Sequence, residues 1–257
     1  MKPLAALLSM IFAVLWVPAA AQTVRVAAAA DLEPVLPPIF EQFRQMTGIQ
    51  CVATYQSSAA LTTQIENGAP FDVFLSANMA YPERLIADGF ASGKPVLYAK
   101  GTLVLWTRKD SHQPAPSLEL LRNPALKRLA IANPERAPYG KAAVAALEKL
   151  GLYDALKPRL ATAENIGQAA QFVDSGNADA GLISMTSAMT PRLAEDGRYF
   201  VIPKDLYPPI EQGAVPITKA ANRDAARRLL DYLMSAPVQE RLRQLGLTPG
   251  RSAPEKP

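Results

Sequence analysis

Small polar and apolar residues cluster at four places where a β-like run passes directly into a helical pattern. These places are residues 28–32, 55–59, 137–141 and 164–167. The first turn of a helix carries unpaired backbone N–H groups and the positive end of the helix dipole, and small side chains let an anion approach them. Four such helix starts meeting in one cleft could bind an oxyanion through neutral donors. Taken singly, each is also typical of an ordinary helix cap.

Other kinds of site find little support in the sequence. The chain has one cysteine, Cys51, in an alternating strand-like run, and one histidine, His112, in a polar loop. One cysteine cannot form an internal disulfide, and a His/Cys metal site needs more ligands than these two residues. There is no Gly-x-Ser-x-Gly elbow or Gly-rich phosphate loop, and a Ser–His–Asp triad would depend on His112. These absences close off several large enzyme classes. Together with the resemblance described below, they lead us to expect a binding protein and not an enzyme, with no cofactor and no bare metal ion.

The elements that must position these residues alternate along the chain. Strands are expected at residues 24–29, 50–55, 71–76, 101–107, 129–132, 180–184 and 213–217. Helices are expected at residues 58–67, 140–150 and 166–175, from Asn222 onwards, and after Pro237 as far as Gly246. This alternation is typical of an α/β architecture with largely parallel sheets.

The first 21 residues have the pattern of a secretory signal. Lys2 supplies a positive start, residues 4–17 are apolar apart from Ser9, and small residues lead up to Ala21. The apolar stretch is shorter than the ~20 residues that a transmembrane helix needs. We expect cleavage after about Ala21 and a periplasmic protein of 257 − 21 = 236 residues. Cys51 lies too far from that point to carry a lipid anchor.

The charge pattern does not favour a nucleic-acid partner. The 27 Lys and Arg residues exceed the 23 Asp and Glu residues by only four, and they are scattered along the chain instead of forming a basic run. A mild positive excess suits an anionic ligand. Nothing in the sequence indicates an oligomer, and we expect a monomer.

At the same four helix starts the chain resembles the periplasmic molybdate-binding proteins of ABC importers, from Val24 to about Leu247. The matching stretches are residues 26–32, Ser57-Ser58 with Leu61 and 64–65, 67–77, 131–134, 137–140 and 164–166. The resemblance implies a type II periplasmic-binding fold, in which two α/β lobes are joined by two crossover segments, here near residues 99–103 and 207–215. Residues 22–99 and 211–257 would form lobe 1 and residues 100–210 lobe 2, with the ligand between them.

The resemblance also implies the ligand-binding residues. Ser58 matches a serine that binds an oxygen of the ligand through its hydroxyl and its N–H. Tyr139 matches a ligand-contacting position at a helix start in lobe 2, and Ile166 matches a residue that offers only its backbone N–H. Ala30 and Asp31 fall on a lobe 1 loop where relatives have Ser, Thr or Asn.

Two positions depart from the pattern of the family. Ser184 stands where some relatives have a ligand-contacting tyrosine, so that contact is absent or replaced. Asp31 is more consequential, because an ionised carboxylate cannot donate a hydrogen bond and would repel a dianion. We expect Asp31 to turn away and cap the following helix, whose regular part should start near Pro38. The alternative is that Asp31 indicates a ligand carrying a proton or a cation.

The expected function is the capture of molybdate and tungstate and their delivery to an ABC permease in the inner membrane. Alternatives are another oxyanion such as sulfate, a ferric cargo, an exported enzyme of the same fold, or a regulatory protein. Iron is disfavoured because Tyr55 and Tyr139, the tyrosines nearest the helix starts, are not adjacent in the sequence. The signal sequence and the lack of a DNA-binding segment disfavour a cytoplasmic regulator.

Overall fold

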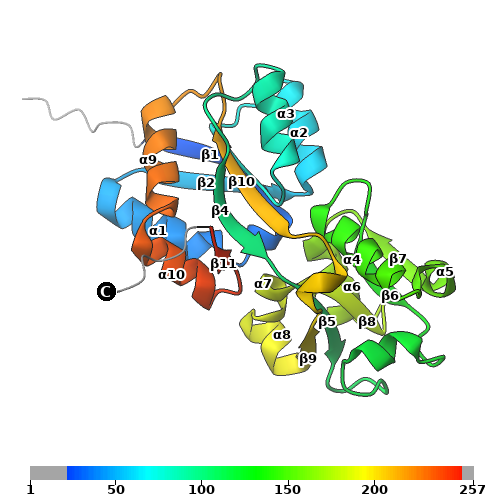
Figure 1. Ribbon diagram of the computed structural model, residues 1–257. Helices are drawn as coiled ribbons and strands as arrows, with labels where there is room; N and C mark the ends of the chain where they lie inside the picture. Colours follow the sequence, from blue (N-terminus) through cyan, green and yellow to red (C-terminus); the bar gives the residue numbers. More distant parts are fainter. Residues whose placement is uncertain (1–21, 251–257) are drawn as a thin grey trace, which may run out of the picture.

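The protein consists of two lobes, each built on its own β-sheet (Figure 1). The computed structural model describes residues 22–250, so the expected signal sequence lies outside the described residues. Elements from the two ends of the described chain, coloured blue and orange to red in Figure 1, share the first lobe. The middle of the chain, in green and yellow, forms the second lobe.

The first lobe contains a six-stranded mixed sheet with the order β11-β4-β10-β3-β1-β2. Its strands are β1 (Thr23–Ala29), β2 (Gln50–Gln56), β3 (Val73–Ser76), β4 (Val96–Gly101), β10 (Ile210–Pro216) and β11 (Thr248–Pro249). β1 runs parallel to β2 and β3, whereas β10 is antiparallel to both β3 and β4. The carboxyl ends of β1 and β2, which are followed by candidate site residues, therefore meet at one edge of the sheet.

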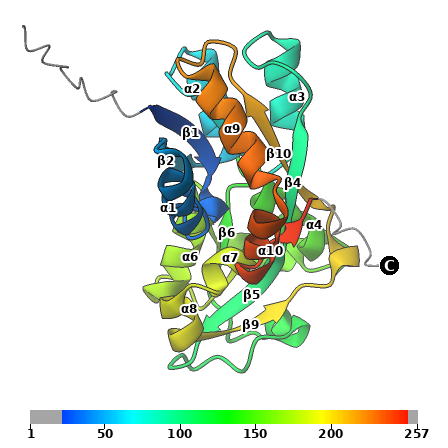
Figure 2. The same cartoon turned by 90° about the vertical axis from the view of Figure 1, so that its left-hand side faces the viewer.

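Helices cover both faces of this sheet (Figures 1 and 2). One side holds α1 (Leu36–Thr47), α9 (Arg223–Leu233) and α10 (Ala236–Gln244), and the other holds α2 (Ser58–Glu66) and α3 (Ala80–Ala87). Each side has a separate apolar core, with Phe43 and Leu229 in the first and Leu61 and Leu85 in the second. Burial of both faces accounts for the almost continuous apolar sequence of β1 and β3.

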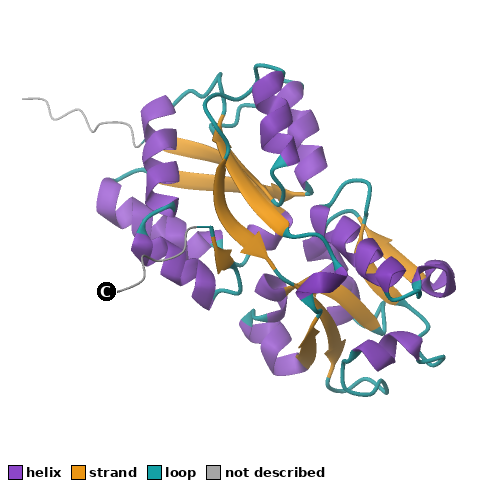
Figure 3. Ribbon diagram, in the orientation of Figure 1, coloured by secondary structure: helices purple, strands orange, loops and turns teal. Residues whose placement is uncertain are grey.

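The second lobe contains a five-stranded mixed sheet with the order β7-β6-β8-β5-β9. Its strands are drawn in orange at the lower right of Figure 3. Its strands are β5 (Leu103–Arg108), β6 (Leu129–Ala132), β7 (Leu160–Ala163), β8 (Ala180–Ser184) and β9 (Gly197–Val201). Its helices are α4 (Pro138–Lys149), α5 (Tyr153–Leu156), α6 (Ile166–Asp174), α7 (Met185–Ala188) and α8 (Pro191–Asp196), with 3₁₀ turns η2 (Leu118–Arg122), η3 (Lys157–Arg159) and η4 (Lys204–Leu206). The core of this lobe also includes Ala29, Ala30 and Ala77 from the first lobe, so apolar packing is continuous between the lobes.

The chain crosses between the lobes twice. Thr102 separates β4 of the first sheet from β5 of the second, and residues 202–209, which include η4, connect β9 to β10. The two crossings touch, because the backbone N–H of Leu103 donates to the Tyr207 hydroxyl at 3.2 Å. The expected lobe bounds stay a prediction, but β4 continues two residues beyond the expected first boundary and β10 starts one residue before the second.

The prediction from the sequence that the sheets are largely parallel was wrong. Both sheets are mixed, because β10 returns antiparallel into the first sheet and β5 lies antiparallel to its neighbours β8 and β9. The single strand expected at residues 101–107 is broken at Thr102, where the chain changes sheets. Four further strands, β4, β7, β9 and β11, were not predicted, because they are short or lack a clean apolar pattern.

Candidate anion site between the lobes

One small cavity lies where the helix starts of both lobes converge. Its lining residues are Ala29, Ala30, Asp31, Gln56, Ser57, Ser58, Ala77, Ala137, Pro138, Tyr139 and Ile166. The volume of the cavity is about 10 Å³, roughly what one water molecule needs. All five residues predicted to bind the ligand are therefore brought together, although their role in binding stays a prediction.

The start of α2 brings Ser58 to this cavity. Ser57 is the N-cap, with a hydroxyl that accepts from the backbone N–H of Ala60 at 3.4 Å. Ser58, the first residue of the helix, is 1% exposed and its hydroxyl oxygen accepts from the backbone N–H of Ala77 at 3.0 Å. This bond ties the helix start to the end of β3 and leaves the hydroxyl proton of Ser58 for another acceptor.

The starts of α4 and α6 approach the cavity from the second lobe. Pro138 is the first residue of α4. Because proline has no backbone N–H, it leaves no unpaired donor at this position, and Tyr139 follows it in the first turn. Asn165 caps α6 by accepting from the backbone N–H of Gln168 at 2.9 Å, and the next residue is the buried Ile166. Because Ile166 has no polar side-chain atom, it can serve an anion only through its backbone N–H.

Asp31 is the only carboxyl group among the residues that line the cavity, and its side chain is completely buried. Its Oδ2 accepts from the Tyr139 hydroxyl at 3.0 Å and from the side-chain amide of Gln212. Gln212 in turn accepts from the Tyr98 hydroxyl at 2.8 Å. The other oxygen, Oδ1, has no hydrogen-bond partner in the described structure. Burial raises the pKa of Asp31 to about 6, and the hydrogen bonds from Gln212 and Tyr139 partly oppose that rise.

The expectation that Asp31 caps the following helix was wrong. Asp31 lies inside a 3₁₀ turn, η1 (Ala30–Leu32), and no side chain caps either η1 or α1. α1 begins at Leu36, five residues beyond Asp31, with prolines in its first turn. The carboxylate is therefore out of capping reach, and it turns inward to the two neutral donors, Tyr139 and Gln212.

Three residues around Asp31 were missed by the sequence analysis. They are Tyr98 on β4, Gln212 on β10 and Thr186 on α7, whose hydroxyl donates to the backbone carbonyl of Asp31 at 2.7 Å. Gln212 could have been noticed as a polar residue beside the apolar run of β10. At Ser184 the ligand contact that some relatives make through a tyrosine was expected to be absent or replaced. The Ser184 hydroxyl caps α7 by accepting from the backbone N–H of Ser187 at 3.2 Å.

The site is electrostatically unusual because its lining has no positive side chain. Among the described residues that form the cavity wall there is no Lys, Arg or His. An anion there would depend on hydroxyl donors and on the N–H groups at the starts of α2, α4 and α6. Within residues 22–250 no group of three His, Cys, Asp or Glu side chains is placed to hold a metal ion, and no helix is long and apolar enough to span a membrane.

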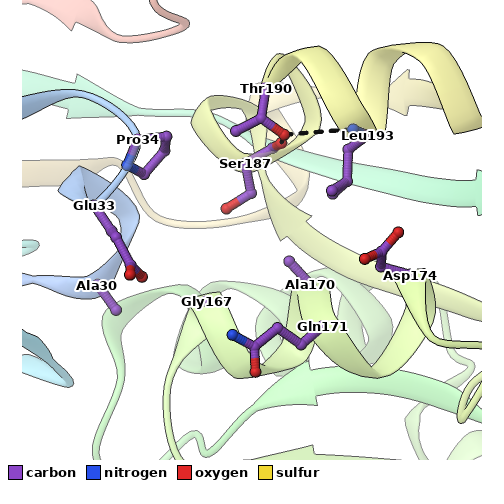
Figure 4. Close-up of a pocket in the computed structure, with 10 residues that line it drawn as sticks. All are labelled: Ala30, Glu33, Pro34, Gly167, Ala170, Gln171, Asp174, Ser187, Thr190 and Leu193. Atoms are coloured by element: carbon purple, nitrogen blue, oxygen red, sulfur yellow. Dashed lines mark hydrogen bonds between the residues drawn. The ribbon is translucent and has the colours of Figure 1, made fainter. Parts of the chain in front are cut away.

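A larger open space of about 240 Å³ lies beside the cavity and shares Ala30 with it (Figure 4). Figure 4 shows Glu33 on the first-lobe side and Gln171 and Thr190 on the second-lobe side. The hydroxyl oxygen of Thr190 accepts a hydrogen bond from the backbone N–H of Leu193 at 3.4 Å. This space is wider and more exposed than the anion cavity, and it continues the gap between the lobes.

Comparisons with known proteins identify the family of the chain. A family model described as bacterial extracellular solute-binding protein matches residues 24–248. The molybdate-binding protein ModA of Azotobacter vinelandii is 39% identical over 89% of this chain and 90% of its own, and that of Rhodobacter capsulatus is 36% identical over 89% of each. The chain belongs to this family of solute-binding proteins. The resemblance found in the sequence is thereby confirmed.

Solved structures confirm the fold class as well. The periplasmic molybdate-binding protein of Azotobacter vinelandii superimposes with a TM-score of 0.83 at 32% identity, covering 88% of this chain and 98% of that one. A sulfate-binding protein, SubI of Mycobacterium tuberculosis, reaches a TM-score of 0.74 at 16% identity, covering 89% of this chain and 87% of its own, which supports the shared fold alone. The family members named here are described as binding proteins, in keeping with the expectation that the chain is not an enzyme.

Proposed function

We propose that this protein captures molybdate, and also tungstate, between its lobes and delivers it to an ABC permease in the inner membrane. The observation that carries the proposal is the convergence of Ala30, Asp31, Ser58, Tyr139 and Ile166 on one cavity. The names of the relatives from Azotobacter vinelandii and Rhodobacter capsulatus support the choice of anion.

The size and chemistry of the cavity favour a small polyatomic anion. Pockets for organic ligands usually measure several hundred Å³, whereas this cavity has about 10 Å³ with the lobes in contact. A sugar or an amino acid is far too large for such a space, and even a tetrahedral oxyanion, which is larger than one water molecule, requires the cavity walls to move apart slightly. A tetrahedral anion presents four acceptor oxygens, which suits donors arriving from several directions, including the Ser58 hydroxyl and the N–H of Ile166.

The contacts between the lobes indicate how the anion would be enclosed. Tyr139 of the second lobe donates to Asp31 of the first, and the backbone N–H of Ala59 donates to the carbonyl of Arg136 at 3.3 Å. The donors on α2 belong to one lobe and those on α4 and α6 to the other. Only the closed arrangement assembles the whole donor set, and hinge opening at the two crossings would release the anion to the permease.

Calorimetry on the protein beginning at Gln22 tests the proposed ligand. Molybdate, tungstate, sulfate and phosphate are titrated in turn, and we expect one tight site for molybdate and tungstate. Heat from sulfate alone would assign the runner-up anion. No binding of either metal oxyanion would overturn the proposal.

The proposal includes four further statements about the protein. It has no catalytic activity, it needs no cofactor, it works as a monomer, and it is exported with cleavage after about Ala21. Mass spectrometry of the protein recovered from the periplasm checks the cleavage point, and light scattering coupled to gel filtration checks the monomer. A retained leader would contradict the export statement, and a stable dimer would contradict the monomer.

A further inference from the structure

The buried Asp31 carboxyl has one satisfied and one unsatisfied oxygen. Oδ2 accepts two hydrogen bonds, from Tyr139 and Gln212, which use both of its lone pairs. Oδ1 is buried without any partner in the described structure, and Asp31 belongs to the wall of the anion cavity. A buried polar atom without a partner is costly unless a ligand or solvent satisfies it.

An ionised Asp31 would be badly matched to a dianion in this cavity. Oδ1 would present lone pairs to the oxygens of the ligand, and no Lys, Arg or His lines the cavity to compensate. Two like charges repel strongly in a buried site, because little water is present to screen them. A protonated Asp31 is well matched, because Oδ2 still accepts from Tyr139 and Gln212 while Oδ1–H donates to the anion.

We propose that Asp31 binds the oxyanion as a neutral carboxylic acid, so that the protein takes up one proton together with each dianion. This inference rests on the proposed function and adds the protonation state of the site. The balance is simple: one proton leaves water or buffer and binds to Oδ1 of Asp31 as the lobes close, and no covalent bond of the ligand changes.

The groups packed around Asp31 leave no other residue to carry this proton. The neighbours on other elements are Tyr139 on α4, Tyr98 on β4, Gln212 on β10, Ile166 on α6 and Thr186 on α7. Gln212, Ile166 and Thr186 do not titrate near neutral pH. Burial, helped by the nearby Asp31 charge, raises the pKa of both Tyr98 and Tyr139 well above 10, so both stay neutral donors. Glu33, two residues along, is exposed to solvent.

Closure of the lobes favours the proton on Asp31. Tyr139 and Thr186 reach Asp31 from the second lobe, whereas Gln212 lies on β10 of the first sheet. When the lobes close they exclude water from Asp31, and this burial is the main cause that raises the pKa of its carboxyl group to about 6. An adjacent dianion adds a second reason for the carboxyl group to hold its proton.

Calorimetry in two buffers measures the proton directly. Molybdate is titrated into the protein beginning at Gln22 at about pH 8, once in Tris and once in Hepes, whose ionisation enthalpies differ. We expect the difference in heat to correspond to about one proton taken up per molybdate. We also expect the affinity to fall about tenfold for each pH unit above about pH 7, the slope for uptake of one proton.

Two variants separate Asp31 from other sources of protons. Asp31→Asn carries a permanent donor at this position, so it should bind molybdate with almost no proton uptake and a flat pH profile. Glu33→Gln removes the neighbouring exposed carboxylate and should behave as the unmodified protein does.

The outcomes distinguish this inference from the proposed function. Tight molybdate binding without proton uptake in the unmodified protein overturns the inference and leaves the proposed function intact. Proton uptake that persists in Asp31→Asn assigns the proton to another group and also overturns it. Absence of any molybdate or tungstate binding overturns the proposed function and the inference together. If Asp31→Asn fails to fold, the two-buffer measurement on the unmodified protein still decides.

Discussion

At the scale of single residues, the site depends on neutral donors whose geometry is fixed by neighbouring backbone. The Ser58 hydroxyl oxygen is held by the N–H of Ala77 at 3.0 Å, which directs its proton elsewhere. Such a preorganised hydroxyl does not have to give up a competing interaction with bulk water when an anion arrives. Its contribution to binding should therefore be that of one hydrogen bond to a charged group.

Replacing Ser58 with Ala should weaken molybdate binding by about 1–3 kcal/mol, the range for losing one hydrogen bond to a charged partner. Titration calorimetry measures the change. Thr63→Ala, at an exposed position of the same helix, is the matched control and should leave the affinity unaltered. An unchanged affinity in Ser58→Ala would place the anion elsewhere.

Replacing Asp31 with Asn should stabilise the ligand-free protein at neutral pH. The folded-state pKa of Asp31 is about 6, above the ordinary 3.8, so between these pH values the folded protein binds more protons than the unfolded chain. The stability that this group contributes is present below about pH 4 and is lost as the pH rises through 6. At pH 7 the loss amounts to roughly 3 kcal/mol, which Asn avoids.

Denaturant unfolding of both proteins at about pH 4 and pH 7 checks this sign. The stability advantage of Asp31→Asn should be larger at pH 7 than at pH 4. An advantage that is equal at both pH values, or larger at pH 4, would mean that the carboxyl group is not held in this buried state.

At the scale of secondary structure, a glycine in β4 makes room for the tyrosine of α4. A Cβ on Gly101 would lie 2.2 Å from the Tyr139 hydroxyl oxygen, far inside van der Waals contact. The strand that enters the first crossing therefore also determines where Tyr139 can point, and through Tyr139 the position of the Asp31 carboxyl group.

Gly101→Ala should displace the Tyr139 hydroxyl and cost about 1–3 kcal/mol of folding free energy, the usual range for overpacking. Molybdate affinity should fall as well, because the helix start carrying Tyr139 is shifted. Combining Gly101→Ala with Tyr139→Phe should be non-additive by more than about 0.5 kcal/mol, since the second change removes the closest clashing atom. Strict additivity in unfolding measurements would show that the two residues do not interfere.

The sequence indicates the helix starts of the site well and the strands behind them poorly. Ser58 and Ile166 begin their helices as expected, because Ser57 and Asn165 are good N-caps and capping is a local property. Gln212 and Tyr98 could not be found in the same way. Gln212 is 181 residues from its partner Asp31, and Tyr98 is 114 residues from its partner Gln212. Only the return of β10 into the first sheet brings both side chains to Asp31. The inward turn of Asp31 has the same long-range origin.

At the scale of the whole molecule, the site is built from residues of both lobes. The Thr186 hydroxyl donates to the Asp31 carbonyl across the gap at 2.7 Å, and a Cβ added to Gly246 of the first lobe would meet Met185 of α7 at 3.0 Å. These contacts link the two lobes directly, so they should favour closure in addition to what the ligand contributes. Loosening them should alter mainly the rate at which the ligand leaves.

Thr186→Val keeps the shape of the side chain but removes this bond between the lobes. We expect molybdate to dissociate roughly 2–10 times faster, which corresponds to one net hydrogen bond of about 0.5–1.5 kcal/mol. Stopped-flow displacement by tungstate measures the rate. Thr63→Val, on the exposed face of α2, should dissociate at the original rate. Equal rates for both variants would show that this contact does not hold the lobes together.

X-ray diffraction from crystals grown with molybdate, recorded at the molybdenum absorption edge, tests most directly whether the converging helix starts hold the anion. The predicted result is a single strong anomalous peak inside the cavity, with ligand oxygens within hydrogen-bond distance of the Ser58 hydroxyl and the Ile166 N–H. A peak only in the wider space beside Glu33 and Gln171, or no peak at saturating molybdate, would contradict it.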